Sequence, residues 1–377
     1  MRPTSGVVAG ARARRSCCRA ARGAVNFAGR PLAYVHISEF MSMRSAFLTG
    51  IAATVAAAGC DAARRTTVAH GEESSIIILA ADSLWAEVGD SVLATLEPRV
   101  FTVRDEKMFE ATYVSPLSED WLKLRGFRQV LAIGRAGDGW VSPALERVAP
   151  PAALPGLVEA PDVWARSQTV TVLLLPDDGT ADALYPLLPV LGERLDARYR
   201  AYVRNRMFMS DANTELRDTL RSQAGFSIVL PRIYGGDVMD SLYVFRNRAE
   251  LGSELIRTIL VTWREGAITL DAESVLGWRD ALTPRVYEPQ LTERERLEVQ
   301  PLEDRGAGAL QVQGIWRGAD PAFPSAGPFL DRVIPCPAQA RTYFLEAWLY
   351  APGRPKYEYM IQMETLLDSF ECGPFGG

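Results

Sequence analysis

The chain has 377 residues, of which 48% are hydrophobic, and it carries a formal net charge of −5. This length suits two domains of ordinary size or one large one, and the apolar content is enough for a buried core. A mean hydropathy of −0.02 excludes a protein with many membrane spans, and the excess of acids argues against a nucleic-acid-binding face.

Residues 1–40 differ in composition from the rest of the chain, with seven arginines, one acid and no lysine. Met41 and Met43 stand where a secretory signal ordinarily begins. We therefore interpret residues 1–40 as a non-native or disordered extension that results from an upstream start codon. An arginine-rich organelle transit peptide is the alternative, because its composition is similar.

Residues 41–59 have the order of a signal peptide. Arg44 precedes a short, uncharged, mostly apolar run, and small residues lead up to Cys60. The run is shorter than the ~20 apolar residues that a spanning helix needs. An alanine-rich N-terminal helix with an incidental cysteine is the alternative. Because the run ends in Ala57-Ala58-Gly59-Cys60, the segment resembles a bacterial lipobox. The resemblance implies cleavage before Cys60, lipidation of its thiol and a location in the cell envelope, at the inner or outer membrane.

The chain from Cys60 onward is more acidic than the whole, with 33 basic and 45 acidic side chains. Its one histidine, His70, lies in the polar stretch 60–74, which we interpret as a tether. The rest of the chain therefore lacks the histidine that Ser-His-Asp or Cys-His catalysis requires. Histidine-ligated metal sites are excluded for the same reason, so we expect no cofactor and no metal.

The first predicted unit spans residues 75–222 and alternates strands with helices, as α/β proteins do. Its apolar runs predict strands at 75–80, 99–104, 108–114, 128–134 and 170–175. Apolar residues at helical spacing predict helices from Asp82 to Leu96, from Thr180 to Phe208 and from Asp211 or Asn213 to Leu220.

The second predicted unit spans residues 225–371 and is followed by a short tail, 372–377. Its pattern predicts strands at 226–231, 240–245, 255–263, 310–316, 329–334 and 342–350. Helices are expected at 271–280 and 356–370. The expected fold class is therefore α/β (α+β), with the second unit an antiparallel sheet flanked by helices.

Two cysteines remain after Cys60, namely Cys336 at the end of a strand and Cys372 after the last helix. An even pair in an oxidising compartment favours a disulfide. Two buried, unpaired thiols are the alternative.

Five short stretches, in this order and spacing, resemble a known protein family: Asp82–Trp85, Phe226–Pro231, Gly314–Trp316, Gly327–Phe329 and Ala347–Pro352. The family is an uncharacterised envelope lipoprotein family, catalogued as domain of unknown function 4837. We expect the resemblance to extend over residues 75–371. The second unit alone resembles the Mog1/PsbP/DcrB type of sandwich, whose members are mostly binding modules. These resemblances imply an envelope location and no catalytic residue.

Two groups of residues are candidate surfaces for a ligand or partner. Arg194 and Arg198 share one face of the long helix and suit phosphate or an acidic polysaccharide. A solvated face paired with neighbouring acids is the alternative. Trp316 and Phe329 flank a Gly/Pro-rich loop and suit a sugar ring or a peptide. Core packing beneath that loop is the alternative.

The sequence favours a non-enzymatic, lipid-anchored envelope protein whose partner is a membrane through Cys60, together with an envelope protein or polysaccharide. An envelope hydrolase that uses paired carboxylates, with or without a metal, is the second hypothesis. A structural domain that associates with itself is the third.

Overall fold

The computed structural model describes residues 67–151, 153–247, 254–266, 268 and 270–373. The predicted lipidation site Cys60 and the segments 1–40 and 41–59 lie outside these residues. The described residues fall within one compact unit, Ala62–Gly377. No helix in this part of the chain has the length and apolarity needed to cross a membrane.

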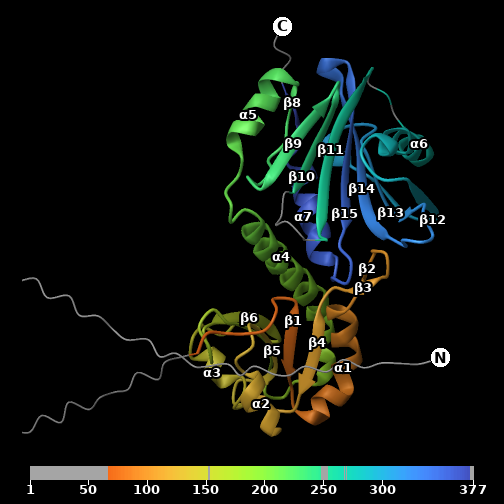
Figure 1. The fold of residues 1–377 in the computed structure, drawn as a ribbon. Helices are drawn as coiled ribbons and strands as arrows, with labels where there is room; N and C mark the ends of the chain where they lie inside the picture. The colour runs from red at the N-terminus through yellow and green to blue at the C-terminus, as the bar shows by residue number, and fades with distance from the viewer. Residues whose placement is uncertain (1–66, 152, 248–253, 267, 269, 374–377) are drawn as a thin grey trace, which may run out of the picture. The chain divides into compact units, whose positions relative to one another are not determined.

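A five-stranded sheet forms the first half of the described chain (Figure 1). Its order is β4 (Glu110–Val114), β1 (Ser75–Leu79), β5 (Gln129–Arg135), β7 (Thr169–Leu175) and β6 (Gly156–Pro161). The first four strands run parallel, and β6 pairs antiparallel with β7. Strands β1, β5 and β7 are mostly apolar and buried because both faces of the sheet are covered there, whereas the edge strand β4 is partly exposed.

Two helical layers cover this sheet. Ile76 and Ile78 of β1 pack towards α1 (Asp82–Leu96), the 3₁₀ segment η1 (Ala181–Leu187) and α4 (Leu188–Met207). Ile77 and Leu79 pack on the opposite side, towards α2 (Glu119–Leu124) and α3 (Ser142–Leu145). The alternating directions of strand side chains account for the two layers.

The first half differs from the sequence prediction in several elements, among them the short helices α2 and α3, which were not predicted. The helix expected from residue 180 is a 3₁₀ segment as far as Leu187, because Pro186 lies within it and a second proline opens α4. The strand expected at 99–104 is a small hairpin of β2 (Arg99–Val100) and β3 (Glu106–Lys107). Strand β6 was not predicted. The end of the expected tether also contacts this half, through bridges from Val68 to Arg166 and from His70 to Phe127.

A seven-stranded antiparallel sheet forms the second half. Its order is β12 (Gln290–Pro301), β13 (Leu310–Gly318), β14 (Ala326–Cys336), β15 (Arg341–Tyr350), β11 (Ile256–Glu265), β10 (Leu242–Asn247) and β9 (Tyr234–Met239). The sheet has α5 (Thr214–Gln223) and α6 (Ala272–Leu282) on opposite sides (Figure 1). Short elements complete this half: β8 (Phe226–Ser227), β16 (Glu371–Cys372), η2 (Thr283–Arg285), η3 (Glu303–Arg305) and η4 (Pro337–Gln339). The expected α/β class and antiparallel second sheet are confirmed.

Strand β15 shows how the second sheet separates its two faces. Tyr343, Leu345, Ala347 and Leu349 pack towards α7 (Tyr357–Asp368) and α5. Phe344 and Trp348 alternate with them and pack on the side of α6. Because α6 has only 11 residues, it leaves the other end of its face to loops and to the pocket described below.

Strand β12 was not predicted, because charged and polar residues dominate its sequence, Gln-Leu-Thr-Glu-Arg-Glu-Arg-Leu-Glu-Val-Gln-Pro. Every one of its residues is exposed or half-buried. It is the edge strand of its sheet. Charged side chains protect such an edge from pairing with another chain, and they also remove the apolar signal by which strands are recognised.

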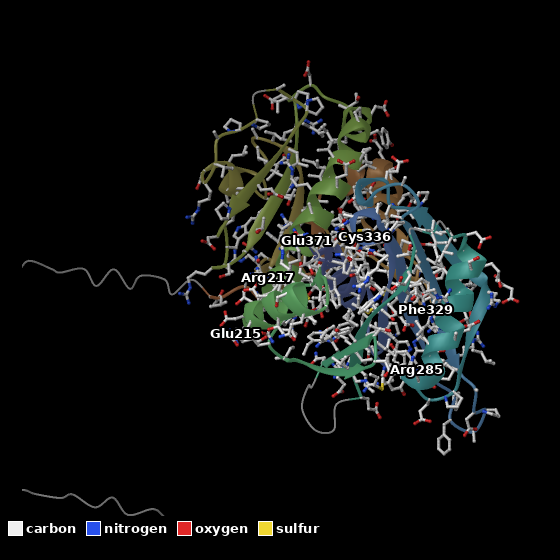
Figure 2. All side chains as sticks on the ribbon, turned by 90° about the horizontal axis from the view of Figure 1, so that it is seen from above. Glu215, Arg217, Arg285, Phe329, Cys336 and Glu371 are labelled. Carbon is white, nitrogen blue, oxygen red and sulfur yellow. A yellow bond between two sulfur atoms is a disulfide. The ribbon has the colours of Figure 1, made fainter. Side chains whose placement is uncertain are left out.

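The disulfide between Cys336 and Cys372 is present, with Cα atoms 6.0 Å apart. It joins the end of β14 to β16, which pairs with β8. Figure 2 labels Cys336 beside Glu371, the residue that precedes Cys372. The bond therefore holds the segment after α7 against the strand end, as the sequence predicted.

Candidate functional site

The main candidate site is a pocket of about 690 Å³ on the α6 side of the seven-stranded sheet. Small-molecule sites in proteins commonly measure ~300–1,000 Å³. Strands β10, β11, β13 and β15 contribute its floor, and two loops, 286–290 and 318–325, contribute its walls. Phe323, which is 77% exposed, lies on the second loop.

The register of the sheet determines which side chains form the floor. Arg246 of β10 lies opposite Thr258 of β11, and Thr258 lies opposite Trp348 of β15. Ile256 and Tyr350 form the next pair on the same face. A row of one cation, one hydroxyl and one indole therefore crosses three adjacent strands.

Three aromatic rings are stacked at the inner wall. The ring of Trp348 lies parallel to that of Tyr287 on one side, with centroids 4.7 Å apart, and to that of Trp316 on the other, with centroids 4.5 Å apart. Trp316 and Trp348 are only 4% and 7% exposed. Since both faces of Trp348 are occupied, this indole offers the pocket an edge rather than an open stacking surface.

The polar atoms of the floor are mainly hydrogen-bond donors. The Thr258 hydroxyl is buried and has no hydrogen-bond partner among the described residues. Gln290 accepts a bond from Trp348 Nε1 at 3.1 Å, but its own buried Nε2 has no partner there. Arg246 donates to the carbonyl of Val286 at 2.8 Å, and no ion pair to it occurs within the described ranges. A buried donor without a partner is costly, so these atoms suit a ligand that accepts hydrogen bonds.

A buried charged cluster lies one row deeper, beneath α6. Asp331 of β14 lies directly opposite Glu346 of β15, and both are 0% exposed. Arg279 of α6 places Nε 3.0 Å from Glu346 Oε1 and 3.8 Å from Asp331 Oδ2. Tyr287, which also lines the pocket, donates its hydroxyl to Glu346 Oε2 at 3.1 Å.

The surroundings of this cluster disfavour the charged form of both carboxyls. Burial, and then the neighbouring Glu346, raise the pKa of Asp331 well above its usual value. Burial also raises the pKa of Glu346, but Arg279 and the Tyr287 hydroxyl oppose that effect. Arg279 and Tyr287 therefore favour the charged form of Glu346, whereas burial and the neighbouring carboxylate favour the protonated form of Asp331.

The predicted arginine surface divides in two. Arg198 is half-buried, pairs with Glu159 at 2.8 Å and also contacts Gln129 and Thr171. Burial lowers the pKa of Arg198. Arg194 is exposed, four residues earlier on the same helix. Since Arg198 is already paired, the two residues do not form one open anion site, and the interpretation as a face paired with acids holds for Arg198.

The predicted aromatic surface also divides. Trp316 lines the pocket, but Phe329, labelled in Figure 2, is 0% exposed and packs in the core under α6. The Arg279 guanidinium lies 4.0 Å from the centre of the Phe329 ring. The prediction that Phe329 belongs to a binding surface is therefore wrong. Its position on the same face as Trp348, directly opposite it in the sheet, explains its burial.

Sequence reasoning missed Arg246, Thr258, Tyr287 and Gln290. One signal was present: Thr258 is a polar residue at the start of the buried run Thr258–Thr262 of β11, whose three middle residues are aliphatic. Tyr287 and Gln290 come from a loop and a charged strand, where the local sequence gives no indication. Within the described residues, no group of three or more His, Cys, Asp or Glu side chains is arranged to hold a metal ion.

Residues 215–369 match the family model of a domain of unknown function, DUF4837. The predicted resemblance is thus confirmed for the second half, and the match does not extend to the first. Similar solved structures include the Ran-binding protein Mog1p of Saccharomyces cerevisiae, at 11% identity and a TM-score of 0.29, covering 40% of this chain and 91% of that one. Cyanobacterial PsbP (CyanoP) of Synechocystis gives 13% identity and a TM-score of 0.28, with 39% and 86% covered. No curated protein matches the chain.

Proposed function

We propose that this protein is a lipid-anchored, non-enzymatic component of the bacterial cell envelope that binds an apolar ligand in the pocket of its seven-stranded sheet. The observation that carries the binding role is the pocket itself, which lies within the DUF4837 segment and combines aromatic walls with unpartnered donors on its floor. The anchor rests on the order of charge, apolar run and small residues before Cys60.

An apolar ligand is favoured over a polysaccharide. Sugar rings bind to open aromatic faces, and both faces of Trp348 are covered by other rings. Ile256, Val286 and Pro289 line the pocket with aliphatic surface, which has no directional requirement.

The hydrolase alternative rests on Asp331 and Glu346, the carboxyl pair that the fold brings together. Hydrolysis by two acids needs room for a substrate between them and for a water. Both residues are 0% exposed and lie beneath α6, so their burial speaks against that role. Their contacts with Arg279 favour a part in fixing α6 to the sheet.

The location is tested by fractionation and intact mass of the full chain in its host, wild type beside Cys60→Ala. We expect a membrane-bound wild-type species that begins at Cys60 and carries added acyl mass, and a released or unprocessed variant. A soluble wild-type chain that retains residues 1–59 would refute the anchor.

The binding role is tested with Nile red, a neutral dye that fluoresces in apolar pockets. Ile256→Arg places a charge on the pocket floor, at a residue that is 38% exposed and can keep the charge solvated. We expect this variant to bind the dye about tenfold more weakly or worse, because a cation displaces apolar contact area. Val238→Arg on β9, at 58% exposure and outside the pocket lining, is the matched control. Equal dye binding by both variants would refute the proposal that apolar ligands bind in this pocket.

A further inference from the structure

The polar side chains of the pocket floor indicate which head group the ligand carries. The inference drawn from them rests on the binding role proposed above. Three side chains bring unused donors to the floor: Arg246, Thr258 and Gln290. Arg246 and Thr258 are a directly opposed pair on adjacent strands, and Gln290 is bonded to Trp348, the next residue in the same row. The register therefore places the donors together rather than around the rim.

The three groups call for an acceptor with negative charge. The Gln290 Nε2 and the guanidinium of Arg246 can only donate, and the Thr258 hydroxyl can do so. Thr258 is 1% exposed, so its unpartnered hydroxyl is removed from bulk water. A ligand that brought only apolar atoms would leave these donors unpaired, whereas a carboxylate has two oxygens with about four acceptor positions.

Nearby acids do not cancel this preference. Among the residues that the structure describes, Glu288 is the only acid that lines the pocket, and it is exposed. The buried Glu346 lies two residues from Trp348 on β15, in the next row of the sheet under α6. Its charge is compensated by Arg279, whose Nε lies 3.0 Å from Glu346 Oε1. Burial and the neighbouring Glu346 raise the pKa of Asp331, which disfavours its charged form.

The rest of the pocket selects the body of the ligand. Ile256, Val286, Pro289, Ala322 and Pro324 line it with aliphatic surface, and Phe323 lies at its loop wall. The stacked rings leave only an indole edge at Trp348. A flexible aliphatic chain fills such a space without needing a free ring face.

From these observations we infer that the pocket binds an aliphatic monocarboxylate, with the carboxylate at Arg246, Thr258 and Gln290 and the chain along the aliphatic wall. The probe is decanoate, compared with decanol and with decyltrimethylammonium, by isothermal titration calorimetry. The chain is used in a Cys60→Ala background, which avoids acylation. Decanoate is expected to bind about tenfold more tightly than decanol, because hydrogen bonds to a charged group add to the apolar term. Decyltrimethylammonium is expected to bind most weakly.

Two variants separate the head group from the chain. Arg246→Met is expected to weaken decanoate binding about tenfold and to leave decanol unchanged, since its side chain keeps the apolar stem. Thr258→Val is expected to weaken decanoate binding about threefold to tenfold, yet to raise the melting temperature of the free chain, because it removes a buried hydroxyl without a partner. Arg285→Met is the control: Arg285 lies just before the pocket wall, is paired with Asp240 at 3.3 Å and does not line the pocket.

The outcomes distinguish this inference from the proposed function. Equal affinity for decanoate and decanol, with both lost in Ile256→Arg, would overturn the carboxylate inference and keep the apolar pocket. Loss of decanoate binding in Arg285→Met to the same extent as in Arg246→Met would also overturn it, because the effect would then follow from overall charge. No binding of any of the three probes would count against the inference and the binding role together.

Discussion

Asp331 and Glu346 lie opposite each other on neighbouring strands, and both side chains are fully buried. Burial and the neighbouring carboxylate raise the pKa of Asp331 in the folded chain. The unfolded chain loses this proton above about pH 4, whereas the folded chain keeps it. The contribution of Asp331 to the free energy of unfolding is therefore fully present below that pH and declines as the pH rises towards the folded pKa.

Asp331→Asn removes this titration while keeping the shape of the side chain. We expect the free energy of unfolding of the variant, relative to wild type, to increase steadily as the pH rises from 4 to 8. Urea denaturation at each pH measures the difference, in which the titration of the other carboxylates cancels. A relative loss of stability that grows with pH would show instead that Asp331 is ionised and paired in the folded chain.

Arg279 is the cation that makes the burial of Glu346 tolerable. Its side chain is 1% exposed, and its guanidinium also donates to Thr292 at 2.9 Å. Arg279→Met is expected to lower the free energy of unfolding by ~3–5 kcal/mol at pH 7, because it leaves a buried carboxylate without its partner. Lowering the pH should recover part of this loss, since protonation of Glu346 removes the unpaired buried charge.

A nearby arginine provides the comparison. Arg294 of β12 pairs with Glu273 and Asp280 at the surface over the same helix. Arg294→Met is expected to change stability by less than ~1 kcal/mol, because exposed ion pairs contribute little. Equal losses in the two variants would contradict the role of Arg279 as the partner of a buried charge on Glu346.

At the scale of elements, the disulfide is the covalent link between the end of β14 and the segment that follows α7. Its half-cystines are 36 residues apart. A loop of this length predicts a loss of about 3–4 kcal/mol when the bond is absent, chiefly through the greater freedom of the unfolded chain. Unfolding of wild type with and without reductant measures the loss. The Cys336→Ala/Cys372→Ala chain is expected to give the same unfolding curve in both conditions. A wild-type curve that reductant does not shift would refute a stabilising bond.

The elements that could be predicted from the sequence are those whose own residues show an apolar pattern or a capping side chain. Strands β1 and β7 are mostly apolar and almost entirely buried, and α6 begins after Asp271, whose carboxylate accepts from Ser274 N at 2.8 Å. Strand β12 was hidden because an edge strand needs charge rather than apolar residues.

The site was less predictable than the fold because it is assembled across strands. Arg246, Thr258 and Trp348 become neighbours only through the register of β10, β11 and β15. Trp316 was found by its residue type, and Phe329 was misplaced for the same reason, since an aromatic side chain serves a core as readily as a surface. The pairing of Asp331 with Glu346 was likewise unavailable from spacing, as these residues are 15 positions apart in the sequence.

At the scale of the whole described chain, α7 is shared between the two halves. Tyr357 and Ile361 at its start pack in the core of the five-stranded sheet, and Met363 and Leu366 pack in the core of the seven-stranded sheet. Glu364 of the same helix pairs with Arg200 of α4 at 2.6 Å. A helix that completes both cores couples their stability, so we expect the predicted units 75–222 and 225–371 to unfold together.

Leu345→Ala tests this coupling from one side. Leu345 is 0% exposed in the core on the α7 side of the seven-stranded sheet, and its truncation is expected to lower the free energy of unfolding by ~2–5 kcal/mol. If the halves unfold together, hydrogen exchange at the amides of β5, in the other sheet, reports the same loss as exchange at β14. Leu131→Ala in β5 is the reciprocal variant and is expected to lower protection in β14 equally. Unchanged protection in the unmutated sheet, in either variant, would mean that α7 joins two domains that unfold separately.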